Sequence, residues 1–327
     1  MTNIKSIFEL QEFIDEAIDQ LVLPLEPKEL YEPIAYILNL GGKRLRPLML
    51  LMVADMYGIP IKKILPQAIG IELFHNFTLI HDDIMDQAPI RRGMVTVHEK
   101  WSTNTAILSG DSLYVKAYEF LLKADPQHLQ PLIHLFNQTA TEVCEGQQLD
   151  MNFESIEVVS MDEYIHMVKH KTAVLLACSL NIGALCADAP NEDQENLYQF
   201  GIFIGIAFQF MDDILDVYGD QKNFGKQLAG DILCNKKTCL YIRAYERADS
   251  SQKKILDHYF AHQDFESQEK ISNVLNVYNS LKVRESCEEI MQEYYATAMN
   301  HLDFVKLPND RKSSLIKFID VLMVRLN

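Results

Sequence analysis

Apolar residues recur along this chain at steps of three and four, and this helical period is the feature that most limits what it can fold into. The first such stretch begins at Ile7 and ends before Pro24. No proline occurs between Pro190 and Pro308, which favours long helices there. No segment alternates with period two between turn residues, as the strands of a hairpin would. The sequence therefore predicts an all-α fold, and we expect residues 1–327 to form one domain.

Two near-copies of an acidic motif each follow a long apolar stretch with helical character. Asp82-Asp-Ile-Met-Asp86 comes after ELFHNFTLI, and Asp212-Asp-Ile-Leu-Asp216 comes after GIFIGIAFQFM. With about 100° per residue, the first and last Asp of each motif lie about 40° apart on one helix face. Apolar residues packed behind them would hold two carboxylates on the wall of a cavity.

Carboxylates this close repel each other and would become neutral if they were partly buried without a partner. A hard divalent cation removes this cost. Mg²⁺ prefers oxygen ligands and usually keeps water and phosphate oxygens in its shell. Two such faces opposite one another would hold metal ions and a diphosphate between them. One DDxxD alone is more often a solvated helix end, but two behind long apolar stretches make that interpretation the weaker one.

Two further polar residues lie on the same faces. His75 precedes Asp82 by seven residues and lies about 20° from it on the helical wheel, and Gln209 lies about 60° from Asp212. A lone histidine on an apolar face is more often a satisfied core residue than a ligand. Because His75 shares a face with a candidate metal site, both interpretations stay open.

Short basic segments contrast with the overall negative charge. GGKRLRP, residues 41–47, places Lys43, Arg44 and Arg46 beside a glycine pair that allows close backbone approach, and these donors suit phosphate. The other basic segments are Arg91-Arg92-Gly93, Lys169-His-Lys171-Thr172, Gly225-Lys226 and Lys236-Lys237-Thr238. Any one of them is surface charge by default, but their positions after the acidic motifs favour phosphate binding.

Charge and composition exclude several classes of protein. Lys and Arg number 30 against 46 Asp and Glu, and the resulting net charge of −16 repels polyanions, which argues against nucleic-acid binding. The longest apolar run, residues 201–211, is too short to span a bilayer, and residues 1–16 do not resemble a signal peptide. The six cysteines show no CxxC spacing and are typical of free thiols. We therefore expect a cytoplasmic protein without a transmembrane segment.

In this order, GGKRLRP, HxxxxxxDDxxD, RRG and FQxxDDxxD resemble the motifs of the trans-prenyl diphosphate synthases. The match runs from about Leu40 to Thr238, and the combination is highly specific. The resemblance implies an antiparallel helical bundle around a deep apolar cavity, a homodimer, and Mg²⁺ as cofactor. It also implies the reaction, which is head-to-tail condensation of isopentenyl diphosphate with an allylic diphosphate.

The resemblance assigns roles to residues at matching positions. The implied metal ligands are Asp82, Asp86 and Asp212, with Asp83 and Asp216 in support. The residues that resemble the family's isopentenyl diphosphate pocket are Lys43, Arg46, His75 and Arg92. Those that resemble its contacts around the allylic diphosphate are Arg91, Lys171, Thr172, Gln209, Lys226 and Lys236. The residues expected to act directly in catalysis are Asp82, Asp86, Asp212, Lys171 and Gln209. A further matching segment, Gly146-Gln147-Gln148-Leu149-Asp150, carries a glutamine that sits near the reacting carbons in the family.

Some positions depart from the family's pattern. Gln227 and Ala229 stand where the family often has Pro and Gly, Asn235 replaces a common Gly, and Ala173 replaces the usual Gly after Lys-Thr. These departures concern the geometry of loops, and no expected charge is missing.

Product length is expected to depend on residues just before the first acidic motif. In the family a bulky residue five positions before the first Asp closes the elongation cavity, and here that residue is Phe77, with Thr78 next to it and Phe74 adding to the block. Both phenylalanines could equally be core residues. On an ideal helix Phe77 lies about 140° from Asp82, so the cavity floor would have to lie to one side of the aspartate face. We expect a product of fifteen or twenty carbons.

Other functions fit part of the pattern. The product could be a longer polyprenyl diphosphate. A class I terpene cyclase shares the fold and the first motif, but it binds one diphosphate and has no need of GGKRLRP. A head-to-head synthase of the squalene type consumes two allylic molecules and no isopentenyl diphosphate. A catalytically silent helical subunit typically loses part of one acidic motif, whereas this chain keeps both.

Overall fold

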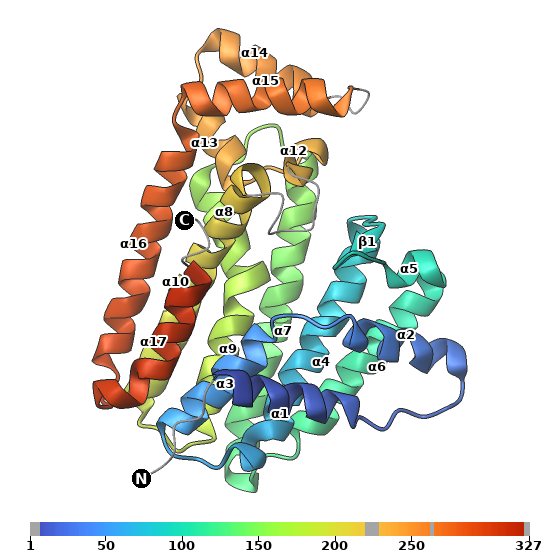
Figure 1. Cartoon of the computed structure of the whole chain (residues 1–327), viewed down its shortest axis with the longest axis vertical. Coiled ribbons are helices and arrows are strands. Elements are labelled where there is room, and N and C mark those ends of the chain that lie inside the picture. Colours follow the sequence, from blue (N-terminus) through green and yellow to red (C-terminus); the bar gives the residue numbers. More distant parts are fainter. Residues whose placement is uncertain (1–6, 220–228, 262–264, 324–327) are drawn as a thin grey trace. The chain divides into compact units, whose positions relative to one another are not determined.

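The computed structural model describes residues 7–219, 229–261 and 265–323, and its regular structure there is helical except for one short hairpin (Figure 1). The predicted all-α fold is confirmed. Contacts within the chain divide it into two compact units, each built from segments that are far apart in the sequence. Unit 1 comprises residues 1–138, 178–198 and 304–320, and unit 2 comprises the rest.

Most of unit 1 comes from the first third of the chain. Its elements up to residue 121 are α1 (Ile7–Asp19), α2 (Lys28–Asn39), α3 (Leu45–Met56), α4 (Ile61–Met85), β1 (Ile90–Arg91), β2 (Met94–Val95), α5 (Val97–Lys100) and α6 (Thr103–Leu121). Helix α4 is its centre and packs against α1, α2, α3, α5 and α6. Two small residues let α4 and α6 approach closely. A Cβ on Gly70 would lie 3.0 Å from the carbonyl oxygen of Ala117, and one on Gly110 would lie 2.4 Å from the ring of His81.

Four helices are shared between the units by residue number. They are α7 (Pro126–Ser155), α9 (Val174–Leu185), α10 (Asn191–Tyr218) and α17 (Asn309–Met323). The other elements belong to unit 2, apart from the last residue of α16: α8 (Met161–Val168), η1 (Lys169–Ala173), α12 (Gly230–Leu233), α13 (Cys239–Arg247), α14 (Ser250–Ala261), α15 (Ser267–Ser280) and α16 (Val283–Phe304). Within unit 2, α15 packs against α12, α13 and α14, and α14 and α15 lie side by side (Figure 1).

The hairpin of β1 and β2 is an element that the sequence pattern did not predict. Its strands have two residues each, too few to show a period of two. Its turn is Arg92-Gly93, and both residues have positive φ, at 53° and 76°. Such a turn matches the right-handed twist of the strands that it joins. The hairpin matters because it carries both arginines of the RRG segment.

Local signals in the sequence place several helix ends. Ser160 accepts from the backbone N–H of Glu163, and the carboxylate of Glu163 accepts from the backbone N–H of Ser160, so this capping box begins α8.

All six cysteines are free thiols. Within the described residues, no helix combines the length and the apolar character that a membrane span requires.

Candidate active site

The first acidic motif ends α4, and its three aspartates differ in their surroundings. Asp82 and Asp86 are half-buried, whereas Asp83 is 1% exposed. Arg91, on β1, donates from Nε to both oxygens of Asp83 at 2.7 and 2.9 Å, and its Nη2 lies 2.7 Å from Asp83 Oδ1. The same Nη2 lies 3.6 Å from Asp82. Burial raises the pKa of Asp83, and the guanidinium opposes that rise. The outer carboxylates are therefore less buried than the middle one.

The glycine pair of GGKRLRP receives an arginine from the hairpin. Arg92 Nη1 donates to the carbonyl oxygen of Gly41, and a Cβ on Gly42 would lie 2.9 Å from the guanidinium of Arg92. On α3, Nη1 of Arg46 lies 3.0 Å from Nε2 of His75. Because arginine only donates, His75 accepts at Nε2. Desolvation and then the charges of Arg46 and Arg92 lower the pKa of His75 well below its ordinary value. All four residues predicted for the isopentenyl diphosphate pocket are in unit 1. Arg92 contacts the glycine pair, and Arg46 contacts His75.

Arg44 has a different role from its neighbours in GGKRLRP. It is buried, and it donates to Glu72 at 2.7 Å, to the carbonyl oxygen of Leu38 at 2.8 Å and to Asp15 at 3.2 Å. The prediction that Arg44 offers donors to phosphate is therefore wrong, because its guanidinium is bound to α1 and α4 and holds the loop in place. Lys43 is exposed.

The aromatic residues before the first motif face α6. The ring of Phe77 stacks on that of Tyr114, with centroids 5.0 Å apart and planes at 17°. Phe74 is fully buried and its ring lies 5.5 Å from both Phe77 and Tyr114. The hydroxyl of Thr78 donates to the backbone carbonyl of His75. The spacing of five residues already displaces Phe77 from the aspartate face, and the structure places its ring against α6.

The second acidic motif ends α10 and repeats the pattern of the first. Asp212 and Asp216 are half-buried, whereas Asp213 is 4% exposed. Asp216 Oδ2 accepts from the backbone N–H of Asp231 at 3.0 Å, and its carbonyl oxygen accepts from the N–H of Ala229 at 2.7 Å. The last aspartate of this motif therefore fixes the start of α12.

Asp213 is bound by three donors from three elements of unit 2. The hydroxyl of Tyr164 on α8 donates to Oδ2 at 2.5 Å, and the backbone N–H of Cys239 on α13 donates to the same oxygen at 3.0 Å. Gln209 Nε2 donates to Oδ1 at 2.9 Å, and the Oε1 of Gln209 accepts from the hydroxyl of Thr172 at 3.2 Å. Burial raises the pKa of Asp213 to about 6, against these hydrogen bonds. Asp213 is part of the second motif, but the sequence pattern does not predict a role for it.

Lys171 and Thr172 lie on a π-helical turn, η1, that is inserted between α8 and α9. Lys171 Nζ donates to Asp150 at 2.5 Å. Two glycines make room for the turn. A Cβ on Gly146 of α7 would lie 2.2 Å from the backbone nitrogen of Lys171, and one on Gly205 of α10 would lie 2.6 Å from the Cα of Ala173. The extra residue of a π turn often marks a functional site, and here it points two predicted substrate contacts at one pocket.

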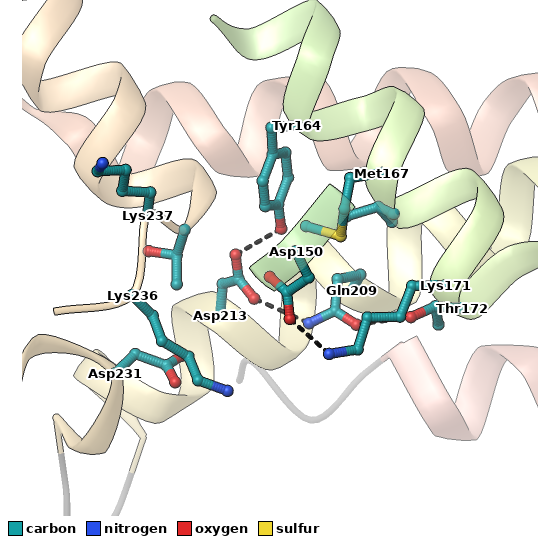
Figure 2. Close-up of a pocket in the computed structure, with 12 residues that line it drawn as sticks. Asp150, Tyr164, Met167, Lys171, Thr172, Gln209, Asp213, Asp231, Lys236 and Lys237 are labelled. Atoms are coloured by element: carbon teal, nitrogen blue, oxygen red, sulfur yellow. Dashed lines mark hydrogen bonds and ion pairs between the residues drawn. The ribbon is translucent and has the colours of Figure 1, made fainter. Parts of the chain in front are cut away.

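The pocket has a volume of about 100 Å³ and lies within unit 2 (Figure 2). It is lined by Asp150, Tyr164, Met167, Val168, Lys171, Thr172, Gln209, Asp213, Asp231, Lys236, Lys237 and Thr238. In Figure 2 the side chains of Lys171 and Lys236 extend to the same side of Asp213, whereas Lys237 points away. Lys237 donates to the backbone carbonyls of Phe153 and Ile156. Four of the six predicted allylic contacts therefore meet here, and the fifth, Arg91, belongs to unit 1.

Two of the departures from the family's pattern, at Ala229 and Asn235, lie at positions with positive φ. Asn235 has φ 58°, a conformation that asparagine tolerates, and its side chain accepts from Nζ of Lys270. Lys270 is 3% exposed and also reaches the carbonyl oxygen of Leu233 at 3.4 Å, so α15 fixes the turn before Lys236. Ala229 also has positive φ, at 60°. Lys226 and Gln227 lie outside the described residues.

The carboxylates of the two motifs fit a hard cation. Within residues 7–219, 229–261 and 265–323, no three His, Cys, Asp or Glu side chains gather as a metal-binding group. The accessible oxygens at both motifs are carboxylates, which suit Mg²⁺ more than softer metals. A site completed by water and substrate phosphate oxygens needs fewer protein ligands.

Comparison with known proteins decides the family. Residues 27–278 match the sequence pattern of the polyprenyl synthetases. The chain belongs to the polyprenyl synthetase family. A geranylgeranyl diphosphate synthase from Methanosarcina mazei is 44% identical over 249 residues, which cover 76% of this chain and 77% of that one. Another, from Sulfolobus acidocaldarius, is 34% identical over 323 residues and covers 97% and 96% of the two chains.

Solved structures agree with this assignment. The crystal structure of a geranylgeranyl pyrophosphate synthase superposes with a TM-score of 0.93 at 41% identity, over 98% of both chains. One from Pyrococcus horikoshii gives a TM-score of 0.89 at 31% identity, over 97% of both. As a member of the polyprenyl synthetase family, the chain is a prenyltransferase.

Proposed function

We propose that this polyprenyl synthetase condenses isopentenyl diphosphate head-to-tail with an allylic diphosphate and makes a product of fifteen or twenty carbons. The observation that carries the proposal is shared by the two acidic motifs. In each, the outer aspartates are half-buried at the end of a long helix, whereas the middle one is almost fully buried and bound by protein donors. Two relatives at 44% and 34% identity are geranylgeranyl diphosphate synthases, which supports the twenty-carbon product.

Both motifs would bind Mg²⁺ through Asp82, Asp86 and Asp212, with Asp83 and Asp216 in support. Bound Mg²⁺ would neutralise the charge that develops on the departing diphosphate. The protein's own part is to hold these carboxylates rigidly. Arg91 does this for Asp83, and the start of α12 does it for Asp216.

The isopentenyl diphosphate would be bound by Lys43, Arg46, His75 and Arg92. A neutral His75 accepts from Arg46 and so orients its guanidinium, whose remaining donors suit a phosphate. Arg92 is aligned with the glycine pair through the carbonyl oxygen of Gly41. This arrangement would place the double bond of the second substrate against the developing cation.

The allylic diphosphate would be held by Arg91, Lys171, Thr172, Gln209, Lys226 and Lys236. Asp150 binds Lys171, and the turn fixed by Lys270 presents Lys236. Next to Gly146, Nε2 of Gln147 is buried and has no hydrogen-bond partner within the described part of the chain. An unused donor of this kind supports a place for Gln147 near bound substrate.

We also propose that the two units act as one catalytic domain in a cytoplasmic homodimer. The family match at residues 27–278 includes parts of both units. Free thiols at all six cysteines are typical of a reducing compartment. The dimer is supported by an exposed apolar stripe on α6 and the residue that ends it, made of Leu108, Val115 and Leu122 at intervals of seven.

The direct test is incubation of the purified chain with Mg²⁺, labelled isopentenyl diphosphate and each allylic starter, followed by separation of products by length. We expect products of fifteen or twenty carbons. The allylic substrate alone is the control: a cyclised hydrocarbon would indicate a terpene cyclase, and activity only after addition of a second protein would indicate a silent subunit.

Product length is tested separately at Phe77. Because its ring stacks on Tyr114 and touches Phe74, Phe77→Ala should remove part of the block and lengthen the product by one or more isoprene steps. Phe120→Ala, also on α6, is the matched control, because the rings that contact Phe77 are those of Phe74, His81 and Tyr114. An unchanged product in Phe77→Ala would show that the residue is only a core aromatic.

A further inference from the structure

Both side-chain oxygens of Asp213, the middle aspartate of the second motif, accept hydrogen bonds from protein donors. Asp213 is 4% exposed. Its Oδ2 accepts from Tyr164 at 2.5 Å and from the backbone of Cys239 at 3.0 Å, and its Oδ1 accepts from Gln209 at 2.9 Å. Figure 2 shows the bonds to Tyr164 and Gln209 leaving from different oxygens of the carboxylate. Three donors on two oxygens fix its orientation.

This arrangement decides which end of the Gln209 amide faces the pocket. An amide has a donor end and an acceptor end, whereas an ionised carboxylate only accepts. The Nε2 end must therefore face Asp213, and Oε1 is left to face Thr172, whose hydroxyl donates to it at 3.2 Å. Gln209 and Thr172 both line the pocket together with Lys171.

We propose that Asp213 is a positioning residue that holds Gln209 with its carbonyl oxygen toward the pocket, where the negative end of the amide dipole favours the cation formed as the allylic C–O bond breaks. Preorganised dipoles of this kind stabilise developing charge without reorganising during the reaction. The inference rests on the proposed function. It gives Asp213 a role distinct from that of its neighbours Asp212 and Asp216, namely orientation of an amide.

The substitution Asp213→Asn tests whether Asp213 orients the amide of Gln209. The backbone N–H of Cys239 always donates, so the new amide must place its oxygen there and toward Tyr164. Its NH₂ group then faces Gln209, where two donors would meet. Gln209 must rotate its amide, which brings Nε2 toward Thr172 and the pocket. The variant is isosteric, but the dipole at the pocket is reversed.

The experiment measures kcat, KM for the allylic diphosphate and the half-saturating Mg²⁺ concentration in four enzymes: wild type, Asp213→Asn, Gln209→Leu and the double variant. Loss of one oriented hydrogen-bonding group predicts a fall of about tenfold in kcat for Asp213→Asn. KM and the Mg²⁺ requirement should change by less than about twofold. In the Gln209→Leu background, Asp213→Asn should have almost no further effect on kcat, because the amide through which it acts is gone.

Other outcomes overturn the inference. Losses that multiply in the double variant would show that Asp213 acts independently of Gln209. A large rise in the Mg²⁺ requirement of Asp213→Asn would identify a metal ligand. If Asp213→Asn does not fold, Tyr164→Phe decides: it should lower kcat in the wild-type background and not in Gln209→Leu, and wild-type kcat in Tyr164→Phe would contradict the proposal. Absence of turnover in the wild-type chain would overturn the proposed function and this role with it.

Discussion

Position within the DDxxD motif separates two kinds of aspartate. Asp83 and Asp213 follow directly after the first Asp of each motif, about 100° further round the helix, and both are buried and bound by protein donors. The outer aspartates are half-buried, and Asp216 also accepts from the backbone N–H of Asp231. In both motifs, therefore, the middle carboxylate is the one most fully committed to the local structure.

His75 makes stability depend on pH at the residue scale. Its pKa is lowered well below 6.5 in the folded chain, so the folded state stays neutral at a pH where the unfolded state takes up a proton. The stabilising contribution is therefore present above about pH 6.5 and lost as the pH falls below it, by up to about 1.4 kcal/mol per pH unit.

Denaturant unfolding at pH 7 and pH 5.5 measures this effect. Wild type should lose more stability on acidification than His75→Gln, which keeps an acceptor for Arg46 but cannot titrate. His134→Gln, at an exposed position on α7, is the control and should behave as wild type. Equal acid sensitivity in His75→Gln and wild type would contradict the lowered pKa.

Much of the candidate site was predicted at this scale, because motif residues carry charges that a sequence displays directly. What the sequence did not show is how each charge is used. Arg44 and Arg46 look equivalent in GGKRLRP, yet Arg44 is bound to Glu72 and Asp15, which are distant in sequence. The role of Asp213 likewise depends on Tyr164 and Cys239, whose approach is a property of tertiary packing.

At the scale of elements, the π turn η1 depends on glycines in two other helices. Gly146→Ala should displace the turn, because the new Cβ would lie 2.2 Å from the nitrogen of Lys171. A misplacement of about 1 Å in a substrate-binding group can lower the rate about a hundredfold. We expect a loss of that order in kcat/KM for the allylic diphosphate, with circular dichroism unchanged.

Cys144→Ala, at an exposed position on the same helix, is the control and should retain full activity. Wild-type kinetics in Gly146→Ala would show that α7 can yield without moving the turn.

The sequence shows the glycine and the Lys-Thr pair but not their contact. For the same reason it could predict the helices, whose period is local, but not the π turn or the two-residue strands.

At the scale of the whole molecule, the stripe on α6 predicts self-association. Leu108, Val115 and Leu122 are 60%, 60% and 55% exposed, and large apolar side chains in a row often mark an interface. Leu108→Lys combined with Val115→Lys should shift sedimentation from dimer toward monomer. Ile255→Lys, on α14, should leave the dimer intact. A wild-type monomer, or an unaffected double variant, would contradict this interface.

The net charge of −16 is also distributed unevenly along the chain. Six of the acids belong to the two DDxxD motifs, and basic side chains are concentrated near them. The net charge therefore does not describe the sites where diphosphates would bind, and the expectation that the chain does not bind nucleic acid stays a prediction.

A Mg²⁺ titration of wild type, Asp82→Asn and Asp212→Asn, with labelled isopentenyl diphosphate and an allylic diphosphate, shows whether both acidic motifs serve the condensation. We predict turnover by wild type that chelation abolishes. Each variant should lose at least about a hundredfold in kcat while keeping its helical content, since each removes an accessible carboxylate of one motif. Full turnover without a divalent metal, or wild-type kcat in either variant, would contradict the account.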